Sequence, residues 1–262
     1  MLPKISIITP TLNQAQFIEE TIISVLSQDY KNMEYIIIDG GSTDNTLSIL
    51  EKYRHRLKFI SEKDQGQVDA INKGLKMVNG DIVAYINSDD LYLPGTFIKV
   101  GRFFLEHDKA MIITGKCLNI DSQGFETRLL IKQYKNFWLT LNNDNFLKIA
   151  NYISQPATFW LRELTKSVGF FNPEYRYAMD YDYWLRIAQK NKIYLIKEYL
   201  AKFRIYPTSI TSSNSKKQFE EEYNIAKEFS NSYYSFLHKL HAITAYGLYK
   251  FSINKGVDGN NN

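Results

Sequence analysis

The sequence predicts an α/β fold, with a mostly parallel sheet flanked by helices and a helical extension at the C-terminus. Two observations predict this fold: apolar runs alternate with segments of helical periodicity over residues 1–90, and a long helical pattern covers residues 217–254. Alternation of this kind is typical of parallel sheets whose strands are joined by helices. A chain of 262 residues is near the upper limit of one hydrophobic core, so we expect one elaborated domain.

Four apolar runs in the first half have the length and composition of buried strands. They lie at residues 5–9, 35–38, 59–60 and 82–86, and helical patterns lie between them at 15–28, 47–53 and 68–78. Polar residues follow the strands, among them Thr9, Asp39, Glu62 and Asp89. Ligands of such sheets bind beyond the carboxyl ends of the strands, so this placement indicates one site.

The second half has a looser pattern. We expect a strand at 111–114, variable and partly helical structure at 119–150, and strands near 154–160 and 193–204 around a helix at 180–190. The long helical pattern at 217–254 is followed by a polar tail, residues 255–262. We find no internal repeat and no low-complexity linker.

Composition excludes several classes of protein. The formal charge of +4 comes without a dense Lys/Arg stripe, so we expect no nucleic-acid partner. The single cysteine, Cys117, excludes an intrachain disulfide framework and fits a reducing compartment. We find neither a signal peptide nor an apolar window of about 18 residues, so we expect a cytoplasmic protein, either soluble or peripheral on the inner face of the membrane.

The motif Asn87-Ser88-Asp89-Asp90 follows a buried strand. Two adjacent carboxylates there repel each other and lose hydration unless a cation or hydrogen bonds offset the cost. Mg²⁺ or Mn²⁺, held by one or two carboxylates and by phosphate oxygens, is one solution. The alternative is a turn in which one aspartate caps the following segment.

Two further segments have the composition of nucleotide contacts. Asp39 precedes Gly40-Gly41, where a ligand can approach the backbone closely. Residues 62–74 are dense in polar groups and begin a helix whose N-terminus suits a diphosphate. The alternatives are a helix cap at Asp39 and an ordinary solvated loop at 62–74.

Asp180 and Asp182 lie two residues apart in a helical pattern. On a helix they point about 200° apart, so only one of them can face a given site. A capped amphipathic helix, with Trp184 in its packing face, is the alternative interpretation.

Together these residues resemble the inverting family-2 glycosyltransferases of the GT-A fold, over about residues 5–211. The matching pieces are Ile5-Ser-Ile-Ile-Thr-Pro-Thr-Leu-Asn13, Gln28-Asp-Tyr30, Ile37-Ile-Asp-Gly-Gly-Ser-Thr-Asp44, residues 64–74, Asn87-Ser-Asp-Asp90, Ser154-Gln-Pro156, Met179-Asp-Tyr-Asp182 and Arg204. The resemblance implies one GT-A domain over 1–215, with a nucleotide-binding half at 1–110 and an acceptor half at 111–215. An extension follows at 216–262.

The resemblance also implies roles for individual residues. The nucleotide sugar would be bound by Thr9, Pro10, Thr11, Asn13, Asp39, Gly66, Asp69, Asn72, Asp89 and Arg204. Asp90 and Asp89 would hold Mn²⁺ or Mg²⁺. Asp180 would be the general base, with Met179 where the family normally has Glu. The acceptor would meet Gln155, Trp184 and Tyr206.

The implied activity is metal-dependent, inverting transfer of a sugar from a nucleotide sugar, with UDP preferred, to an acceptor hydroxyl. The acceptor would be a saccharide or a lipid-linked saccharide, as in polysaccharide or glycoconjugate synthesis. The Gln-x-x-Arg-Trp motif and membrane helices of the processive members are absent from the sequence, which favours one transfer per encounter.

Two other functions remain open. A sugar-1-phosphate nucleotidyltransferase would also use an α/β sheet, a nucleotide and Mg²⁺, but the segment Thr9-Pro-Thr-Leu-Asn13 has no cation for a triphosphate. A non-catalytic carbohydrate- or partner-binding module is the second alternative, and the aspartates at 39, 89, 90 and 180 argue against it.

The C-terminal pattern indicates an interaction surface. Residues 229–255 contain three lysines and many aromatic and apolar residues but no Asp or Glu. Such a helix suits a membrane interface near a lipid-linked acceptor. The alternative is packing on the domain itself or on a second subunit, which would make a homodimer.

Overall fold

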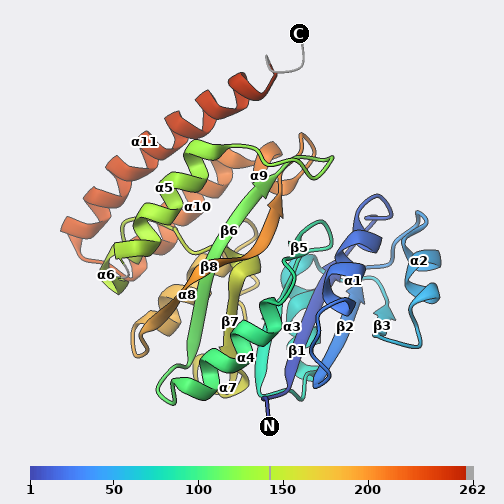
Figure 1. Cartoon of the computed structure of the whole chain (residues 1–262). Helices are drawn as coiled ribbons and strands as arrows, with labels where there is room; N and C mark the ends of the chain where they lie inside the picture. Colours follow the sequence, from blue (N-terminus) through green and yellow to red (C-terminus); the bar gives the residue numbers. More distant parts are fainter. Residues whose placement is uncertain (142, 258–262) are drawn as a thin grey trace.

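The computed structural model describes residues 1–141 and 143–257. Its strands form one eight-stranded sheet in the order β3-β2-β1-β4-β7-β6-β8-β5, with helices on both faces (Figure 1). The strands are β1 (Ile5–Thr11), β2 (Met33–Asp39), β3 (Lys58–Ser61), β4 (Ile82–Tyr85), β5 (Leu91–Tyr92), β6 (Ile112–Ile120), β7 (Thr158–Leu161) and β8 (Ile193–Arg204).

The first half of the chain is the parallel part of the sheet. β1 pairs in parallel with β2 and β4, and β2 pairs in parallel with β3, as the alternating pattern predicts. In the second half, β7 runs antiparallel to both β4 and β6, whereas β6 and β8 are parallel. β5 pairs antiparallel with β8. The prediction of a mostly parallel sheet is therefore confirmed.

Two hydrophobic cores occupy the two faces of the sheet. Ile5 and Ile7 of β1 pack in one core with α1 (Ile18–Leu26), α2 (Thr46–Lys52) and α4 (Thr96–Glu106). Ile8 packs in the other with α3 (Gln67–Met77), α7 (Arg162–Val168) and α8 (Met179–Ala188). A Cβ on Gly74 would lie 2.5 Å from Ile8 Cγ2, so glycine lets α3 lie directly against β1. This contact helps to fix the position of α3 relative to the strand ends.

The single helix predicted at 217–254 is wrong, because the chain forms two helices there. α10 (Ser215–Glu228) ends before a short connection, and α11 (Ser232–Val257) begins after it. Asn231 Oδ1 accepts a hydrogen bond from Tyr234 N at 3.1 Å, which caps the first turn of the new helix. Ser230 Oγ donates to Ala226 O at 2.6 Å at the end of the old one. The apolar periodicity continues through the break and conceals it.

α11 extends to Val257, three residues beyond the predicted end, and residues 258–262 of the predicted tail lie outside the described residues. It packs against α10 and α5 (Leu129–Leu141), and the three helices lie together at one end of the sheet (Figure 1). Shorter helices are α6 (Asp144–Leu147), η1 (Gln155–Ala157) and α9 (Ile210–Ser213). No helix in the described part of the chain is long and apolar enough to cross a membrane.

Candidate active site

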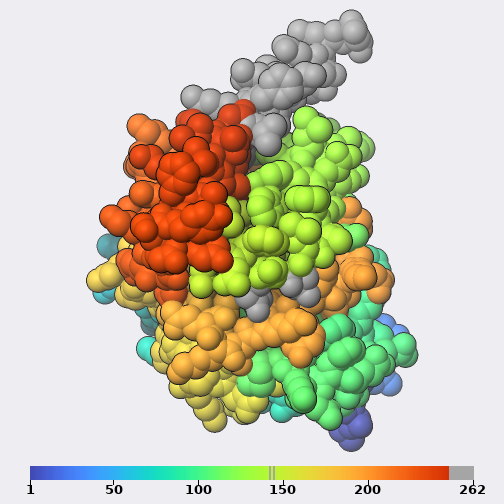
Figure 2. Space-filling model, turned by 90° about the vertical axis from the view of Figure 1, so that its left-hand side faces the viewer, coloured from blue at the N-terminus to red at the C-terminus, as the bar shows by residue number. Residues whose placement is uncertain are grey.

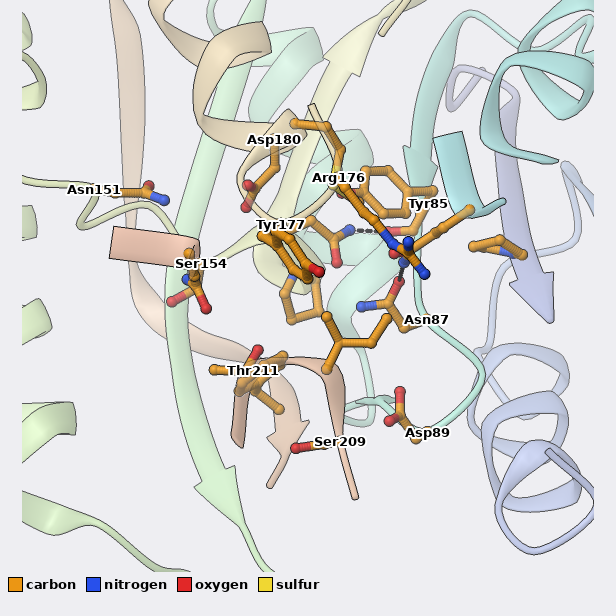
Figure 3. A pocket seen from close by; sticks show the side chains of 18 of the residues that line it. Tyr85, Asn87, Asp89, Asn151, Ser154, Arg176, Tyr177, Asp180, Ser209 and Thr211 are labelled. Atoms are coloured by element: carbon orange, nitrogen blue, oxygen red, sulfur yellow. Dashed lines mark hydrogen bonds between the residues drawn. The ribbon is translucent and has the colours of Figure 1, made fainter. Parts of the chain in front are cut away.

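A cavity of about 1040 Å³ lies beyond the carboxyl ends of β1 and β4. Its walls include the first turn of α3, the start of α8, the end of β8 and parts of α5, α10 and α11. The predicted site residues that line it are Pro10, Thr11, Gly66, Asp69, Asn72, Asp89, Gln155, Asp180, Arg204 and Tyr206. Figure 3 shows Asp89 and Ser209 at one end of this cavity and Asp180, Asn151 and Ser154 at the other.

Asp89 is held in place by two residues at the end of β8 and just after it. Tyr206 Oη donates a hydrogen bond to Asp89 Oδ2 at 3.0 Å, and Arg204 Nε donates to the Asp89 carbonyl oxygen at 2.9 Å. Burial raises the pKa of the Asp89 carboxyl. Tyr206 therefore orients a carboxylate of the site, a role that the sequence did not reveal.

Asp90 does not line the cavity, contrary to its predicted place as a metal ligand. It is fully buried, its Oδ1 accepts from Arg204 N at 2.9 Å, and its Oδ2 accepts from Asn87 Nδ2 at 3.3 Å. Burial, together with the charge of Asp89, raises its pKa well above the usual range. In the described part of the chain, no group of three or more His, Cys, Asp or Glu residues is arranged to hold a metal.

Arg204 lines the cavity, but its guanidinium group is engaged by the protein. Nη1 donates to the carbonyl oxygens of Asp121 and Ser122 at 3.3 and 3.0 Å, and Nη2 pairs with Glu20 Oε2 at 2.6 Å. The group also lies 4.6 Å from the ring centroid of Phe17. Arg204 thus ties the Asp89 turn to two other segments, which leaves little of it for a phosphate.

Asp39 is also away from the cavity, because its own loop satisfies its carboxylate. Oδ2 accepts from the backbone N–H groups of Gly41 and Ser42 at 3.1 and 2.9 Å and from Ser61 Oγ at 2.6 Å. Ser42 Oγ donates to Oδ1. These bonds close the loop and do not cap the following helix, whose N-cap residue is Asn45, and a base or ribose would reach Asp39 only after they rearrange.

The first strand contributes one open contact to the cavity. Thr9 is buried, with Oγ1 2.9 Å from Tyr35 Oη of β2, and Asn13 Oδ1 accepts from Thr43 N of a neighbouring loop at 2.8 Å. Neither residue lines the cavity. Thr11 lines the cavity, and its Oγ1 is buried with no hydrogen-bond partner in the described structure. Glu62 lies outside the cavity and pairs with a lysine of α3.

The N-terminal turn of α3 faces the cavity. Gly66 precedes it with φ 111°, which favours glycine, and no side chain caps the amides of the turn. Asp69 pairs with Lys73 at 3.2 Å. The side chain of Asn72 bonds both the N–H and the carbonyl oxygen of Phe171, at 3.0 and 2.9 Å, so it joins α3 to the loop before α8. The open amides suit an anion.

Asp180 lies in the first turn of α8, at the end of the cavity opposite Asp89. It is half-buried, and burial raises its pKa to about 6. Asp182 pairs with Arg186 at 2.8 Å and does not line the cavity, which confirms that only one of the two carboxylates faces it. Trp184 is fully buried against Trp160 in the core, so its predicted contact with an acceptor is wrong.

The sequence missed two glutamates of α10. Glu221 accepts hydrogen bonds from the backbone N–H groups of Arg176, Tyr177 and Ala178 at 2.6, 3.1 and 3.3 Å, and so holds the loop that leads into Asp180. Glu222 is buried in the cavity wall, and burial raises its pKa to about 7. The run of three glutamates in this helix does not itself indicate which of them face inward.

Solved glycosyltransferases share this fold. The mannosyltransferase PcManGT from Pyrobaculum calidifontis, in complex with GDP-Man and Mn²⁺, matches with a TM-score of 0.69 and 19% identity over 92% of this chain and 69% of that one. S. aureus TarS 1–349 in complex with UDP-GlcNAc matches with a TM-score of 0.65 and 22% identity, over 85% of this chain and 65% of that one. The chain thus has the GT-A fold of these enzymes.

The family model described as Glycosyl transferase family 2 matches residues 6–169, and the chain belongs to this family. A Haemophilus influenzae protein named only as an uncharacterized glycosyltransferase is 30% identical over 237 residues, 86% of this chain and 73% of the relative. A PGL/p-HBAD biosynthesis glycosyltransferase of Mycobacterium bovis is 30% identical over 190 residues, 70% of this chain and 69% of the relative. The family expected from the motifs is confirmed.

Proposed function

We propose that this glycosyltransferase moves one sugar per encounter from a UDP-sugar to an acceptor hydroxyl, with inversion at the anomeric carbon. The observation that carries the proposal is the placement of Asp89 and Asp180 at opposite ends of one cavity. Asp89 and the N-terminal turn of α3 would receive the nucleoside diphosphate, and Asp180 would act on the acceptor. The first 110 residues then form the donor half, and residues 111–215 with the helical extension form the acceptor half.

Asp180 has the properties of a general base. With a pKa of about 6 it is mostly ionised at pH 7 to 8, yet it still holds a proton more tightly than an exposed aspartate. It would take the proton of the acceptor hydroxyl as that oxygen attacks the anomeric carbon. Direct attack from the face opposite the departing UDP inverts the configuration and needs no covalent intermediate with the enzyme.

Asp89 fits a divalent cation together with the donor phosphates. Its carboxyl is half-buried at the cavity wall, where its charge calls for a counterion, and Mg²⁺ or Mn²⁺ is commonly held by one or two carboxylates together with phosphate oxygens. Such a cation, when bound, would offset the charge that develops on the departing diphosphate. Asp90 would support Asp89 from behind, through its bond to the Arg204 backbone.

Relatives support the choice of a nucleotide-sugar donor and of the biosynthetic process. TarS is solved with UDP and with UDP-GlcNAc, and PcManGT with GDP-Man and Mn²⁺. The M. bovis relative is named for PGL/p-HBAD biosynthesis. We therefore propose a saccharide or lipid-linked saccharide acceptor and a role in glycoconjugate or polysaccharide synthesis on the cytoplasmic side, where a free buried Cys117 is compatible with reducing conditions.

The outer face of α11 would contact an anionic membrane surface. Tyr233, Phe236, Leu240 and Ile243 are 47–64% exposed and recur every three or four residues, so they form one stripe. Neither α11 nor the neighbouring α5 contains an acidic residue, although both carry lysines. Figure 2 shows these two helices side by side on one face of the molecule. Lys239 is exposed beside this stripe, so the face suits anionic lipid more than it suits a second copy, which would bring the same lysine close to its equivalent.

A screen of nucleotide sugars tests the proposal. We expect release of UDP from at least one UDP-sugar in the presence of Mn²⁺ or Mg²⁺, increased by a saccharide acceptor. NMR of the product should show the anomeric configuration opposite to that of the donor. Retention of configuration, or release of pyrophosphate from a nucleoside triphosphate and a sugar 1-phosphate, would contradict it.

A further inference from the structure

The Asp180 end of the cavity contains buried hydrogen-bond acceptors that have no donor. Gln155 is 8% exposed, and its Oε1 has no partner; Asn151 Oδ1 is also buried without one. Both residues line the cavity, together with Glu222 of α10. Buried polar atoms in folded proteins nearly always have a partner, so a cluster of such oxygens indicates a missing ligand that brings donors.

The orientation of the two amides follows from their neighbours. Gln155 Nε2 donates to the carbonyl oxygen of Tyr85 at 2.6 Å, and Asn151 Nδ2 donates to Glu222 Oε1 at 3.2 Å. Turning the Gln155 amide over would place its oxygen against the Tyr85 carbonyl oxygen, and turning the Asn151 amide over would place its oxygen against a carboxyl that is mostly ionised at pH 8. Their oxygens are therefore the atoms left without a partner in the cavity wall.

Glu222 adds a third acceptor. The amides of Asn151 and Gln218 both donate to its Oε1, at 3.2 and 3.1 Å, and the residue lines the cavity. The carboxyl is 5% exposed. Lys135 also lines the cavity, and its positive charge opposes those of Asp180 and Glu222 on this side.

We propose that Gln155, Asn151 and Glu222 form the subsite that binds the acceptor as a neutral sugar ring with at least two free hydroxyls. The inference rests on the proposed function. The hydroxyls beside the attacking one donate to these three side chains, and the attacking hydroxyl faces Asp180. Tyr177 and Pro156 line the same cavity and offer apolar surface to the ring.

Transfer at pH 8, where Asp180 is ionised, tests the subsite. The probes are p-nitrophenyl glycosides of glucose, galactose, mannose and N-acetylglucosamine, given with the UDP-sugar that the wild-type protein hydrolyses fastest. Replacing Glu222 with Gln puts a donor where an acceptor oxygen stood. We expect acceptor kcat/KM to fall about 10- to 100-fold, the usual range for a hydrogen bond to a charged group, and UDP affinity by calorimetry to stay within twofold.

The matched control is Glu220→Gln, on the same helix but exposed and outside the cavity, which should behave as wild type. Asn151→Ala is the second variant if Glu222→Gln folds poorly. It should likewise lower acceptor kcat/KM and leave UDP affinity within twofold of wild type. Glycosides that lack one hydroxyl locate the contact. Removal of the hydroxyl that binds Glu222 should lower kcat/KM in the wild type but cause no further decrease in Glu222→Gln.

Three results decide the matter. Acceptor kcat/KM within twofold of wild type in folded Glu222→Gln and Asn151→Ala proteins would overturn the subsite. Donor hydrolysis that no saccharide stimulates, or that only the amino sugar glucosamine stimulates, would also overturn a neutral acceptor sugar. Absence of donor hydrolysis by the wild-type protein would overturn the proposed function instead.

Discussion

The two ends of the cavity are built in opposite ways. Around Asp89, the polar side chains are already bonded to the protein: Asp90 accepts from the backbone of Arg204, Arg204 donates to the Asp89 carbonyl oxygen, and Tyr206 donates to the Asp89 carboxylate. Around Asp180, Gln155 and Asn151 keep buried oxygens without donors. Under the proposed assignment of the two ends, the donor end is largely preformed, whereas the acceptor end is completed by its substrate.

The largest effect should come from the base. Asp180→Asn keeps the shape of the side chain but cannot take a proton, so turnover with acceptor should fall about 10²–10⁴-fold. UDP affinity should stay near that of wild type, because the change is at the other end of the cavity. Steady-state kinetics and calorimetry check both. Asp182→Asn is the control, and a larger loss of turnover in that variant would move the base to Asp182.

The complementary change is at the donor end. Asp89→Asn removes the negative charge that would meet the cation, so UDP affinity in Mn²⁺ should fall about 10- to 100-fold, a typical loss for altered metal sites. Calorimetry with UDP, with and without Mn²⁺, measures it. Tyr206→Phe should give a smaller loss, because it removes only the bond that orients Asp89. Equal affinity with and without metal in the wild type would refute the cation site.

The pH dependence of transfer should also distinguish the Asp180 end of the cavity from the Asp89 end. The raised pKa of Asp180, about 6, means that its carboxylate is fully formed above pH 7 and is lost as the pH falls through 6. Acceptor kcat/KM should therefore drop about tenfold per unit below pH 6. A pH profile from 4.5 to 9 checks this. A profile that stays flat down to pH 5 would mean that Asp180 has an ordinary pKa or does not act as the base.

Glu222 should affect stability in the opposite direction from an ordinary aspartate or glutamate. Its folded pKa of about 7 lies above the usual 4.5, so its contribution to stability is present below pH 4.5 and is lost as the pH rises through 7. Between pH 5 and 9, Glu222→Gln should gain about 2–3 kcal/mol in unfolding free energy relative to wild type. Urea unfolding at both pH values tests this, with Glu220→Gln expected to show no such gain.

The smallest effect concerns the surface of α11. Phe236→Ser with Leu240→Ser removes half of the exposed stripe, so sedimentation with anionic phosphatidylglycerol vesicles should fall about tenfold. Leu105→Ser, at an exposed apolar position of α4, is the control. Unchanged sedimentation would remove the membrane role. If the wild type and the Leu105→Ser control form a concentration-dependent dimer and the double variant is monomeric, the stripe binds a second copy instead.

The sequence predicts the first half of the fold well because local signals determine it. The apolar runs of β1, β2 and β4 and the helical pattern of α3 reveal these elements. It predicts the donor end less well, because three residues of the motifs, Asp39, Thr9 and Asn13, do not line the cavity. The side chains of Asp39 and Asn13 bond loops, and that of Thr9 bonds a residue of β2. A motif places a residue near a site without showing which partner its side chain takes.

The acceptor end escapes the sequence for another reason. Asn151, Gln155 and Glu222 come from a loop, η1 and α10, and meet only because α10 folds back over the start of α8. No spacing rule links residues 70 positions apart. The break between α10 and α11 escapes the sequence for a different reason, because the helical spacing of apolar residues continues on both sides of it.

A crystal structure with UDP and Mn²⁺ tests the central claim most directly, because that claim assigns the donor to one end of the cavity. We expect the diphosphate between Asp89 and the N-terminal turn of α3, with Mn²⁺ on the Asp89 carboxylate. The space between Asp180, Asn151 and Glu222 should stay open to an acceptor. A diphosphate bound against Asp180 or Glu222 would contradict the assignment of the two ends.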